Sequence, residues 1–286
     1  MDARHGTFNT VGRDINNYHY YNEPIMSDSS TKTPPPLSFN DAPIDFLSPQ
    51  FTGRETDLEY IRNILDMNYD GVPSRCAVYG MHGMGKTQLA LQYAKLSFIR
   101  QRYSVIFWIS GATVEKLNQG FGKVVVLVGL PDYQEQSTRL IAARRWLEEA
   151  TSKWLLVLDN VSQEAVSFLR DFLPRKNISG HILLTTRTAI VAETVTAVAG
   201  QQHQIYELRV PDLKDATSLL LRESEIDTNG LVSPSTSSAE ALVKCVGCLP
   251  FAISQAASFA KQSHKSLDDV LDLYRSKWRY HVGLKL

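Results

Sequence analysis

Cysteine, long apolar runs and an excess charge of either sign are all scarce in this sequence. Only three of its 286 residues are cysteines, too few for a disulfide framework, so we expect a reducing, cytoplasmic setting. No stretch stays apolar over the roughly 20 residues that a membrane-spanning helix needs, so we expect no membrane partner. Thirty basic residues balance thirty acidic ones, and this neutrality argues against a protein that mainly coats nucleic acid.

The chain divides into four stretches of different composition. Residues 1–22 are rich in asparagine and tyrosine and are too short to form a core. Residues 23–50 contain "SDSSTKTPPPLS", and such prolines and hydroxyl residues are typical of an extended linker. Residues 51–210 alternate short apolar runs with helix-like segments, and residues 211–286 show helical patterns only. We therefore expect an α/β core followed by a small helical subdomain.

The alternating stretch predicts an α/β fold with a parallel sheet, because apolar strands separated by helices indicate a sheet covered on both faces. The expected strands are residues 76–80, 105–109, 154–158, 181–186 and, at a sheet edge, 204–208. The expected helices are residues 54–66, 86–99, 113–127, 134–150, 163–172, 212–225, 238–246, 251–263 and 267–278.

The clearest local motif is "GMHGMGKT", which runs from Gly80 to Thr87. It fits G-x-x-x-x-G-K-[ST] between an apolar strand and an amphipathic helix, which is the context of a P-loop. The glycines let backbone amides face phosphate oxygens, while Lys86 can reach the β- and γ-phosphates and Thr87 can ligate Mg²⁺. The sheet is therefore expected to be that of a P-loop NTPase. The predicted nucleotide-binding residues of this segment are Gly80, Gly83, Met84, Gly85, Lys86, Thr87 and Gln88.

A second motif, "KWLLVLDNV", places Asp159 and Asn160 at the end of a buried strand. Downstream of a P-loop, such a carboxylate can hold the Mg²⁺ of the nucleotide, and we expect this strand to lie beside the P-loop strand. The alternative is that Asp159 caps the next helix. Asn160 can orient a water molecule but cannot accept its proton at neutral pH, so we predict firm nucleotide binding with slow or no hydrolysis.

Three further stretches complete an ordered set: "FTGRE" (residues 51–55), "LLTTR" (183–187) and "GCLPFA" (247–252). In order and spacing the set resembles the motifs of an NB-ARC domain, of the STAND class of P-loop NTPases, over about residues 51–280. The resemblance implies that Thr52 and Arg54 contact the adenine of ADP or ATP. It also implies that Arg187 reads the γ-phosphate and that Pro250 packs against the base. From the residues alone, Arg54 could equally be solvated, Arg187 could pair with a surface acid, and Pro250 could simply start a helix.

The resemblance also implies a function. In the family, ADP holds a closed form and ATP favours an open form that assembles into homo-oligomers. We expect such a switch here, in a fungal-type innate-immunity or cell-death pathway, with Asp159, Asn160 and Arg187 as the catalytic set. Asn160 departs from the family, which usually has a second acid there, and the sequence ends before the family's winged-helix segment.

Two other functions stay open at this stage. The chain could be a working P-loop ATPase or a nucleotide kinase, although no arginine-rich lid segment is evident. It could also be a STAND-type transcriptional regulator, but we find no winged-helix reader and do not expect nucleic-acid binding.

The N-terminal stretch "TFNTVGRDINNYHYYN" has the asparagine-rich, proline-free composition of segments that stack as cross-β ladders. It resembles short signalling motifs of fungal STAND receptors, which implies a downstream effector that binds residues 7–22. The alternative is a disordered tail.

Overall fold

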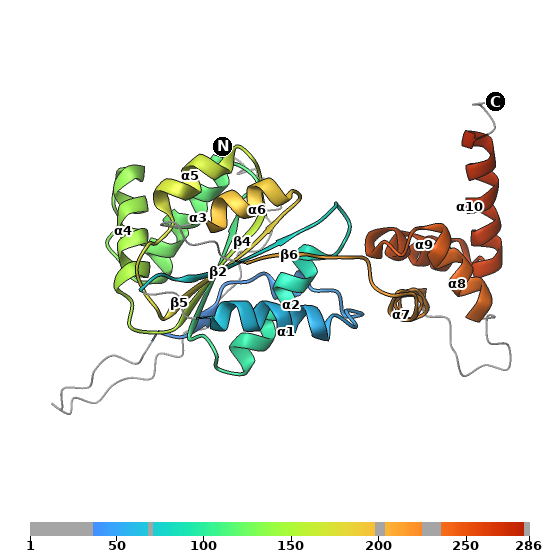
Figure 1. Cartoon of the computed structure of the whole chain (residues 1–286), viewed down its shortest axis with the longest axis horizontal. Helices are drawn as coiled ribbons and strands as arrows, with labels where there is room; N and C mark the ends of the chain where they lie inside the picture. The colour runs from blue at the N-terminus through green and yellow to red at the C-terminus, as the bar shows by residue number, and fades with distance from the viewer. Residues whose placement is uncertain (1–36, 68–70, 198–203, 225–235, 283–286) are drawn as a thin grey trace, which may run out of the picture. The chain divides into compact units, whose positions relative to one another are not determined.

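A parallel sheet forms the centre of the α/β core (Figure 1). The computed structural model describes residues 37–67, 71–197, 204–224 and 236–282. Within them the sheet has the order β1-β3-β4-β5-β2-β6, and all its paired strands are parallel. The strands are β1 (Phe39–Asn40), β2 (Ser74–Tyr79), β3 (Val105–Ser110), β4 (Trp154–Val161), β5 (Gly180–Thr186) and β6 (Ile205–Glu207). The predicted fold class is confirmed.

One expectation about the strand order is wrong. The strand that carries Asp159, β4, does not lie beside the P-loop strand β2, because β5 is inserted between them. Both strands have a buried apolar stretch, Trp154–Leu158 in β4 and Ile182–Leu184 in β5. Such stretches do not indicate which of the two strands lies next to β2. The end of β5 therefore lies between the ends of β2 and β4 in the sheet.

Helices cover both faces of the sheet, and alternate residues of the strands serve the two layers. Trp154, Leu156 and Leu158 pack in one layer, while Leu155 and Val157 pack in the other. The first layer is completed by α3 (Val114–Leu127), α4 (Gln136–Glu149), α5 (Ala165–Phe172) and α6 (Ala189–Thr196). The second is completed by α1 (Glu55–Asp66) and α2 (Lys86–Ile99). Of these helices, α6 is absent from the sequence-based expectations.

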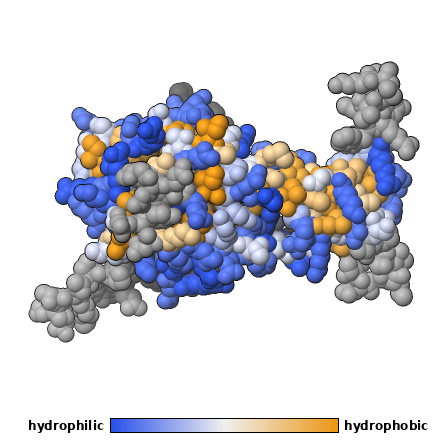
Figure 2. All heavy atoms as spheres, viewed as in Figure 1, coloured by the Kyte–Doolittle hydropathy of each residue, from blue (hydrophilic) through white to orange (hydrophobic). Residues whose placement is uncertain are grey.

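The helices after residue 211 have an apolar core of their own. They are α7 (Leu213–Ser224), α8 (Thr236–Cys245), α9 (Pro250–Ser263) and α10 (Leu267–Val282). Leu220, Leu242, Ile253 and Val270, one from each helix, are fully buried together. On the face drawn in Figure 2, apolar side chains reach the surface over this region as well as over the α/β core, with polar side chains between them.

The segment before residue 51 contains ordered elements. Strand β1 and the 3-10 helix η1 (Ile44–Phe46) lie within residues 23–50, which the composition assigns to a linker. All described residues belong to one compact unit, residues 36–286. The predicted N-terminal motif, residues 7–22, lies outside the described residues. Among the described helices, none combines the length and the apolar composition needed to cross a bilayer.

Candidate functional site

The P-loop connects β2 to α2, and two of its glycines adopt backbone conformations that side chains disfavour. Gly83 has a φ of 82° and Gly85 a φ of 89°, both in the left-handed region. A Cβ on Gly83 would lie 3.0 Å from the Cβ of Phe251, so this glycine also allows α9 to approach closely. No side chain caps the start of α2, which begins directly after Gly85. The amides and partial positive charge of this helix terminus are therefore available to an anion.

Lys86 reaches back over the loop that precedes it. Its Nζ donates hydrogen bonds of 2.7 Å to the carbonyl of Gly80 and of 2.7 Å to that of Met81. Burial, and secondarily the charge of Arg187, lower the pKa of Lys86, while Asp159 acts in the opposite direction. The ammonium thus lies where phosphate oxygens could replace the two carbonyls as its acceptors.

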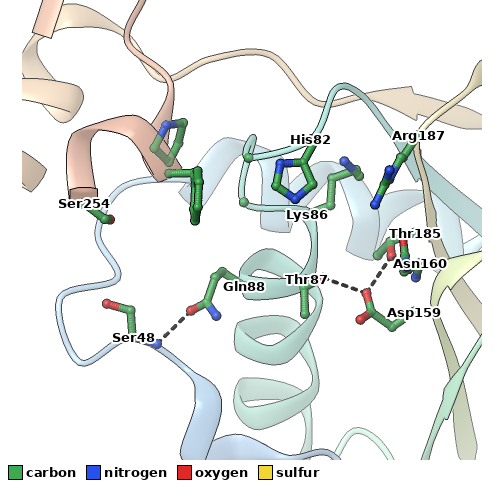
Figure 3. A pocket seen from close by; sticks show the side chains of 14 residues that line it. Ser48, His82, Lys86, Thr87, Gln88, Asp159, Asn160, Thr185, Arg187 and Ser254 are labelled. Atoms are coloured by element: carbon green, nitrogen blue, oxygen red, sulfur yellow. Dashed lines mark hydrogen bonds between the residues drawn. The ribbon is translucent and has the colours of Figure 1, made fainter. Parts of the chain in front are cut away.

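The Asp159 carboxylate is oriented by two hydroxyl groups. Thr87 Oγ1 and Thr185 Oγ1 both donate to Asp159 Oδ1, at 2.8 Å and 2.7 Å respectively (Figure 3). The backbone N–H of Asn160 in turn donates to Thr185 Oγ1 at 2.8 Å. Asn160 has a φ of 57° and lies where the register of β4 against β5 shifts, which aims its N–H at β5. Thr185, on the intervening strand, therefore holds Asp159 beside the P-loop.

The donor set at this point suits Mg²⁺. The Thr87 hydroxyl can give its proton to Asp159 and still offer an oxygen lone pair to a cation. One hydroxyl and one carboxylate are few ligands, but Mg²⁺ is usually bound by one or two carboxylates together with substrate phosphates and waters. The arrangement therefore fits a magnesium ion that arrives with a nucleotide.

These groups share a cavity of about 530 Å³. Nine predicted site residues line it: Gly83, Gly85, Lys86, Thr87, Gln88, Asp159, Asn160, Arg187 and Pro250. An adjoining cavity of about 90 Å³ is lined by Thr52, Arg54 and Met84, and shares Gly85, Gln88 and Pro250 with the larger one. Gly80 lines neither and contributes its carbonyl to Lys86. The fold thus brings the predicted residues to one region.

Arg54 ties three segments of the chain together. Its guanidinium donates to the carbonyl of Met84 in the P-loop at 3.2 Å and to that of Arg209 at 2.7 Å. It also pairs with Asp57 at 3.2 Å, and Asp57 accepts a hydrogen bond from the hydroxyl of Tyr206. The side chain of Arg54 is only 12% exposed, so it is not the solvated residue that the sequence alone allowed.

Arg187 and Pro250, for which the sequence alone allowed roles away from a nucleotide, also line the larger cavity. Arg187 is exposed, and no ion pair with an acid is found for it among the described residues. Pro250 is the first residue of α9, so it starts a helix and lines both cavities at once.

Sequence reasoning missed several residues that line the larger cavity: Ser48, His82, Thr185, Phe251 and Ser254. Thr185 lies inside "LLTTR", where only the arginine was assigned a role. Ser48 is fixed by a contact across 40 residues, because its N–H donates to Oε1 of Gln88 at 2.7 Å. Gln88 also donates to the carbonyl of Phe46 at 2.9 Å. No local pattern before residue 51 indicates this pairing.

Comparison with known proteins yields one family and several similar folds. The family model of the NB-ARC domain matches residues 54–222. A nucleotide-binding leucine-rich repeat (NLR)-like protein of Hyaloscypha variabilis is 27% identical over 244 residues, covering 79% of this chain and 24% of that protein. The chain therefore spans about a quarter of the length of that relative.

Two solved structures show similarity in fold alone. In the Escherichia coli HORMA:CdnC:Trip13 complex, a chain aligns with a TM-score of 0.55 and 16% identity, over 83% of this chain and 93% of that one. The Aeropyrum pernix ORC1 protein, solved in complex with DNA, aligns with a TM-score of 0.53 and 14% identity, over 82% of this chain and 68% of that one.

Proposed function

This chain belongs to the NB-ARC family, and on that premise we propose that it is a signalling switch that binds ADP or ATP together with Mg²⁺. One observation carries the proposal: the hydrogen bond of 2.8 Å between the Thr87 hydroxyl and the Asp159 carboxylate, in the same cavity as Lys86. A P-loop threonine, a lysine and a strand-end carboxylate together form the minimal set for a nucleotide phosphate chain and its cation.

The phosphate chain would bind over the open start of α2. Backbone amides of the P-loop and the helix terminus contact its oxygens, and Lys86 exchanges the carbonyls of Gly80 and Met81 for the β- and γ-phosphates. Thr87 and Asp159 would hold Mg²⁺, which neutralises phosphate charge. Arg187, exposed at the same cavity, is the candidate for contact with the γ-phosphate.

The base would occupy the smaller cavity. Its walls come from the segment around Thr52 and Arg54, from Met84 of the P-loop and from Pro250 of α9. The name of the NLR-like relative supports a nucleotide as the ligand, and adenine as its base is what the family resemblance implies. The walls combine apolar side chains such as Met84 and Pro250 with the acids Asp215 and Glu223, which could accept hydrogen bonds from a base.

Hydrolysis is expected to be slow. Asn160 follows Asp159 at the place where a second carboxylate could accept a proton from water, and an amide cannot do so. Its backbone N–H is already engaged by Thr185. The protein would therefore hold a nucleotide for a long time, which suits a switch better than a motor.

The nucleotide would control the position of the helical region. Phosphate-binding groups belong to the α/β core, whereas Pro250 and Phe251 belong to α9, so a bound nucleotide contacts both parts. ADP and ATP can shift the balance between closed and open forms only by their difference in affinity for the two. We propose that the ATP-bound form opens and assembles into homo-oligomers in the cytoplasm. A role in a fungal-type immunity or cell-death pathway, with an effector that binds residues 7–22, is part of the same proposal and rests on the motif resemblance of the sequence.

The test is the nucleotide that the purified full chain carries. After denaturation, released nucleotide is identified and quantified by anion-exchange chromatography. Close to one equivalent of ADP supports a resting switch. An empty protein that turns over ATP rapidly would contradict the proposal and favour an ordinary ATPase.

A further inference from the structure

His82, a P-loop residue whose side chain the motif leaves unspecified, lines the phosphate cavity. Figure 3 shows its imidazole beside Lys86, with Arg187 further along the same side. The side chain is exposed to the cavity, and no hydrogen bond to it is found among the described residues. An imidazole carries one N–H donor when neutral and two when protonated. His82 therefore offers an uncommitted donor to an anion in this cavity.

The charges around His82 indicate which part of the anion it would meet. Lys86 and Arg187 line the same cavity as His82. A P-loop lysine contacts the β- and γ-phosphates, so the terminal phosphate of a nucleoside triphosphate would lie near these two cations. The His82 ring lies next to Lys86 at the same end (Figure 3). A diphosphate, one phosphate group shorter, leaves this end unfilled.

His82 and Gly83 of the P-loop also contact Phe251 in the first turn of α9. The ring of His82 lies 5.6 Å from that of Phe251, at an interplanar angle of 77°, an edge-to-face contact. The N–H of Phe251 donates to the carbonyl of Gly83 at 3.1 Å. His82 thus connects the phosphate cavity to the helical region through a single side chain.

We propose that His82 discriminates triphosphate from diphosphate by donating a hydrogen bond to the terminal phosphate, and that it reports this contact to α9 through Phe251. When the ring turns toward the phosphate, it gives up its edge contact with Phe251, so triphosphate binding and this contact compete. The inference rests on the proposed nucleotide function and assigns its regulation to one P-loop side chain. ADP leaves the contact intact and ATP weakens it.

The first test compares the affinities of MgATP and MgADP by calorimetry on the full chain. For His82→Ala we expect about tenfold weaker MgATP binding, the loss of one hydrogen bond to a charged group, and less than about a twofold change for MgADP. His82→Gln, which keeps an N–H donor, should restore most of the MgATP affinity. An unchanged ratio of the two affinities in His82→Ala overturns the proposal.

The second test addresses the link to α9. Phe251→Leu removes the aromatic partner and should raise the preference for MgATP over MgADP about threefold. Phe259→Leu, an equally apolar change of an exposed residue on α9 outside both cavities, should leave the preference unchanged. In the His82→Ala background, Phe251→Leu should have no further effect, because the two residues act as one unit. A shift of equal size in that background would show that Phe251 acts without His82 and would overturn the link.

The outcomes separate this inference from the proposed function. If the unaltered chain binds neither nucleotide, the proposed function fails. If it binds both and His82→Ala changes neither, the switch stands and the role of His82 is refuted.

Discussion

The two ends of strand β5 both carry polar groups, but these groups have different surroundings. At the amino end, Nδ1 of His181 and the hydroxyl of Tyr103 share a hydrogen bond of 2.7 Å, and Arg102 pairs with Asp66. These four residues line one cavity of about 340 Å³. At the carboxyl end, Thr185 contacts Asp159 at the edge of the phosphate cavity.

The two clusters differ in how their charged groups are paired. At the amino end Arg102 is paired with Asp66, while Lys153 forms no ion pair among the described residues. Burial, with smaller contributions from Arg102 and Lys153, lowers the pKa of His181 to about 4. This histidine is therefore neutral at pH 7. At the carboxyl end two cations, Lys86 and Arg187, share a cavity with the single carboxylate of Asp159. Each cavity thus has two cations and one carboxylate, so neither polarity nor net charge separates the two strand ends. They differ in the carboxylate: Asp66 is paired with Arg102, whereas Asp159 accepts from two hydroxyls and forms no ion pair among the described residues.

The largest expected effect comes from removing the cation at the carboxyl end. Lys86→Ala should weaken ADP binding by about 10- to 100-fold, because at least one charged hydrogen bond to phosphate is lost. Because the carbonyls of Gly80 and Met81 lose their donor, the free energy of unfolding without nucleotide should also fall, but by less than the free energy of ADP binding. Calorimetry and a melting curve measure both, with Lys116→Ala, a change of an exposed lysine on α3, as the control. If Lys86→Ala lowered the free energy of unfolding as much as the free energy of ADP binding, Lys86 would be a structural residue and the contrast between the two ends of β5 would be lost.

Replacing His181, at the amino end of β5, should alter the stability of the fold and leave ADP binding unchanged. The pKa of His181 is lower in the folded chain, about 4, than the ordinary value of 6.5, so the unfolded chain binds a proton first as the pH falls. The stabilisation is complete above pH 6.5 and is lost as the pH falls toward 4, by about 2–3 kcal/mol. His181→Gln should flatten that part of the curve of unfolding free energy against pH, measured with urea.

ADP affinity at pH 7 should be the same in His181→Gln as in the unaltered chain. A large loss of affinity would show that the amino end belongs to the functional site after all.

Two arginines of the region around α1 sharpen the comparison further. Arg54 and Arg62 each pair with an acid three residues away, but their side chains are 12% and 46% exposed. Arg54→Ala also deprives two backbone carbonyls of their partner, so we expect about 2 kcal/mol of destabilisation in urea unfolding. Arg62→Ala should cost less than about 0.5 kcal/mol, as exposed ion pairs do. If the two variants lost similar amounts of unfolding free energy, the hydrogen bonds of Arg54 to the two carbonyls would not stabilise the fold.

The smallest and most selective effect is expected at Thr185. Thr185→Val removes the hydroxyl that donates to Asp159. The ratio of the ADP affinities measured with and without Mg²⁺ should then fall about tenfold. Thr186→Val removes the neighbouring buried hydroxyl, which donates to the carbonyl of Val161 instead, and should lower stability without changing the Mg²⁺ effect. Thr185→Ser should behave like the unaltered chain. Identical Mg²⁺ dependence in both valine variants would reduce Thr185 to a structural residue.

Local features of this protein follow from its sequence. The strands, most helices and the P-loop depend on runs of apolar residues and on a motif of eight residues, and the structure places them within a few residues of the predicted bounds. For example, the helix predicted at residues 86–99 is α2. The edge position of β6 also agrees with its expected place.

Features that depend on distant partners do not follow from the sequence. The order of β4 and β5 depends on how two buried strands pack, and β1 exists because Phe39 and Asn40 pair with β3. The roles of Ser48 and Thr185 arise from hydrogen bonds to residues 40 and 26 positions away. Thr52, Arg54, Arg187 and Pro250 came from the family resemblance, and their roles toward a nucleotide stay predictions.

The most direct test of the central claim is a titration of the full chain with ADP, with Mg²⁺ and in EDTA, for the unaltered chain and for Asp159→Asn. If Thr87 and Asp159 hold the cation of the nucleotide, Mg²⁺ should tighten ADP binding by the unaltered chain at least about tenfold and have little effect on the variant. Equal affinities with and without Mg²⁺ in the unaltered chain, or an unchanged Mg²⁺ effect in Asp159→Asn, would contradict it.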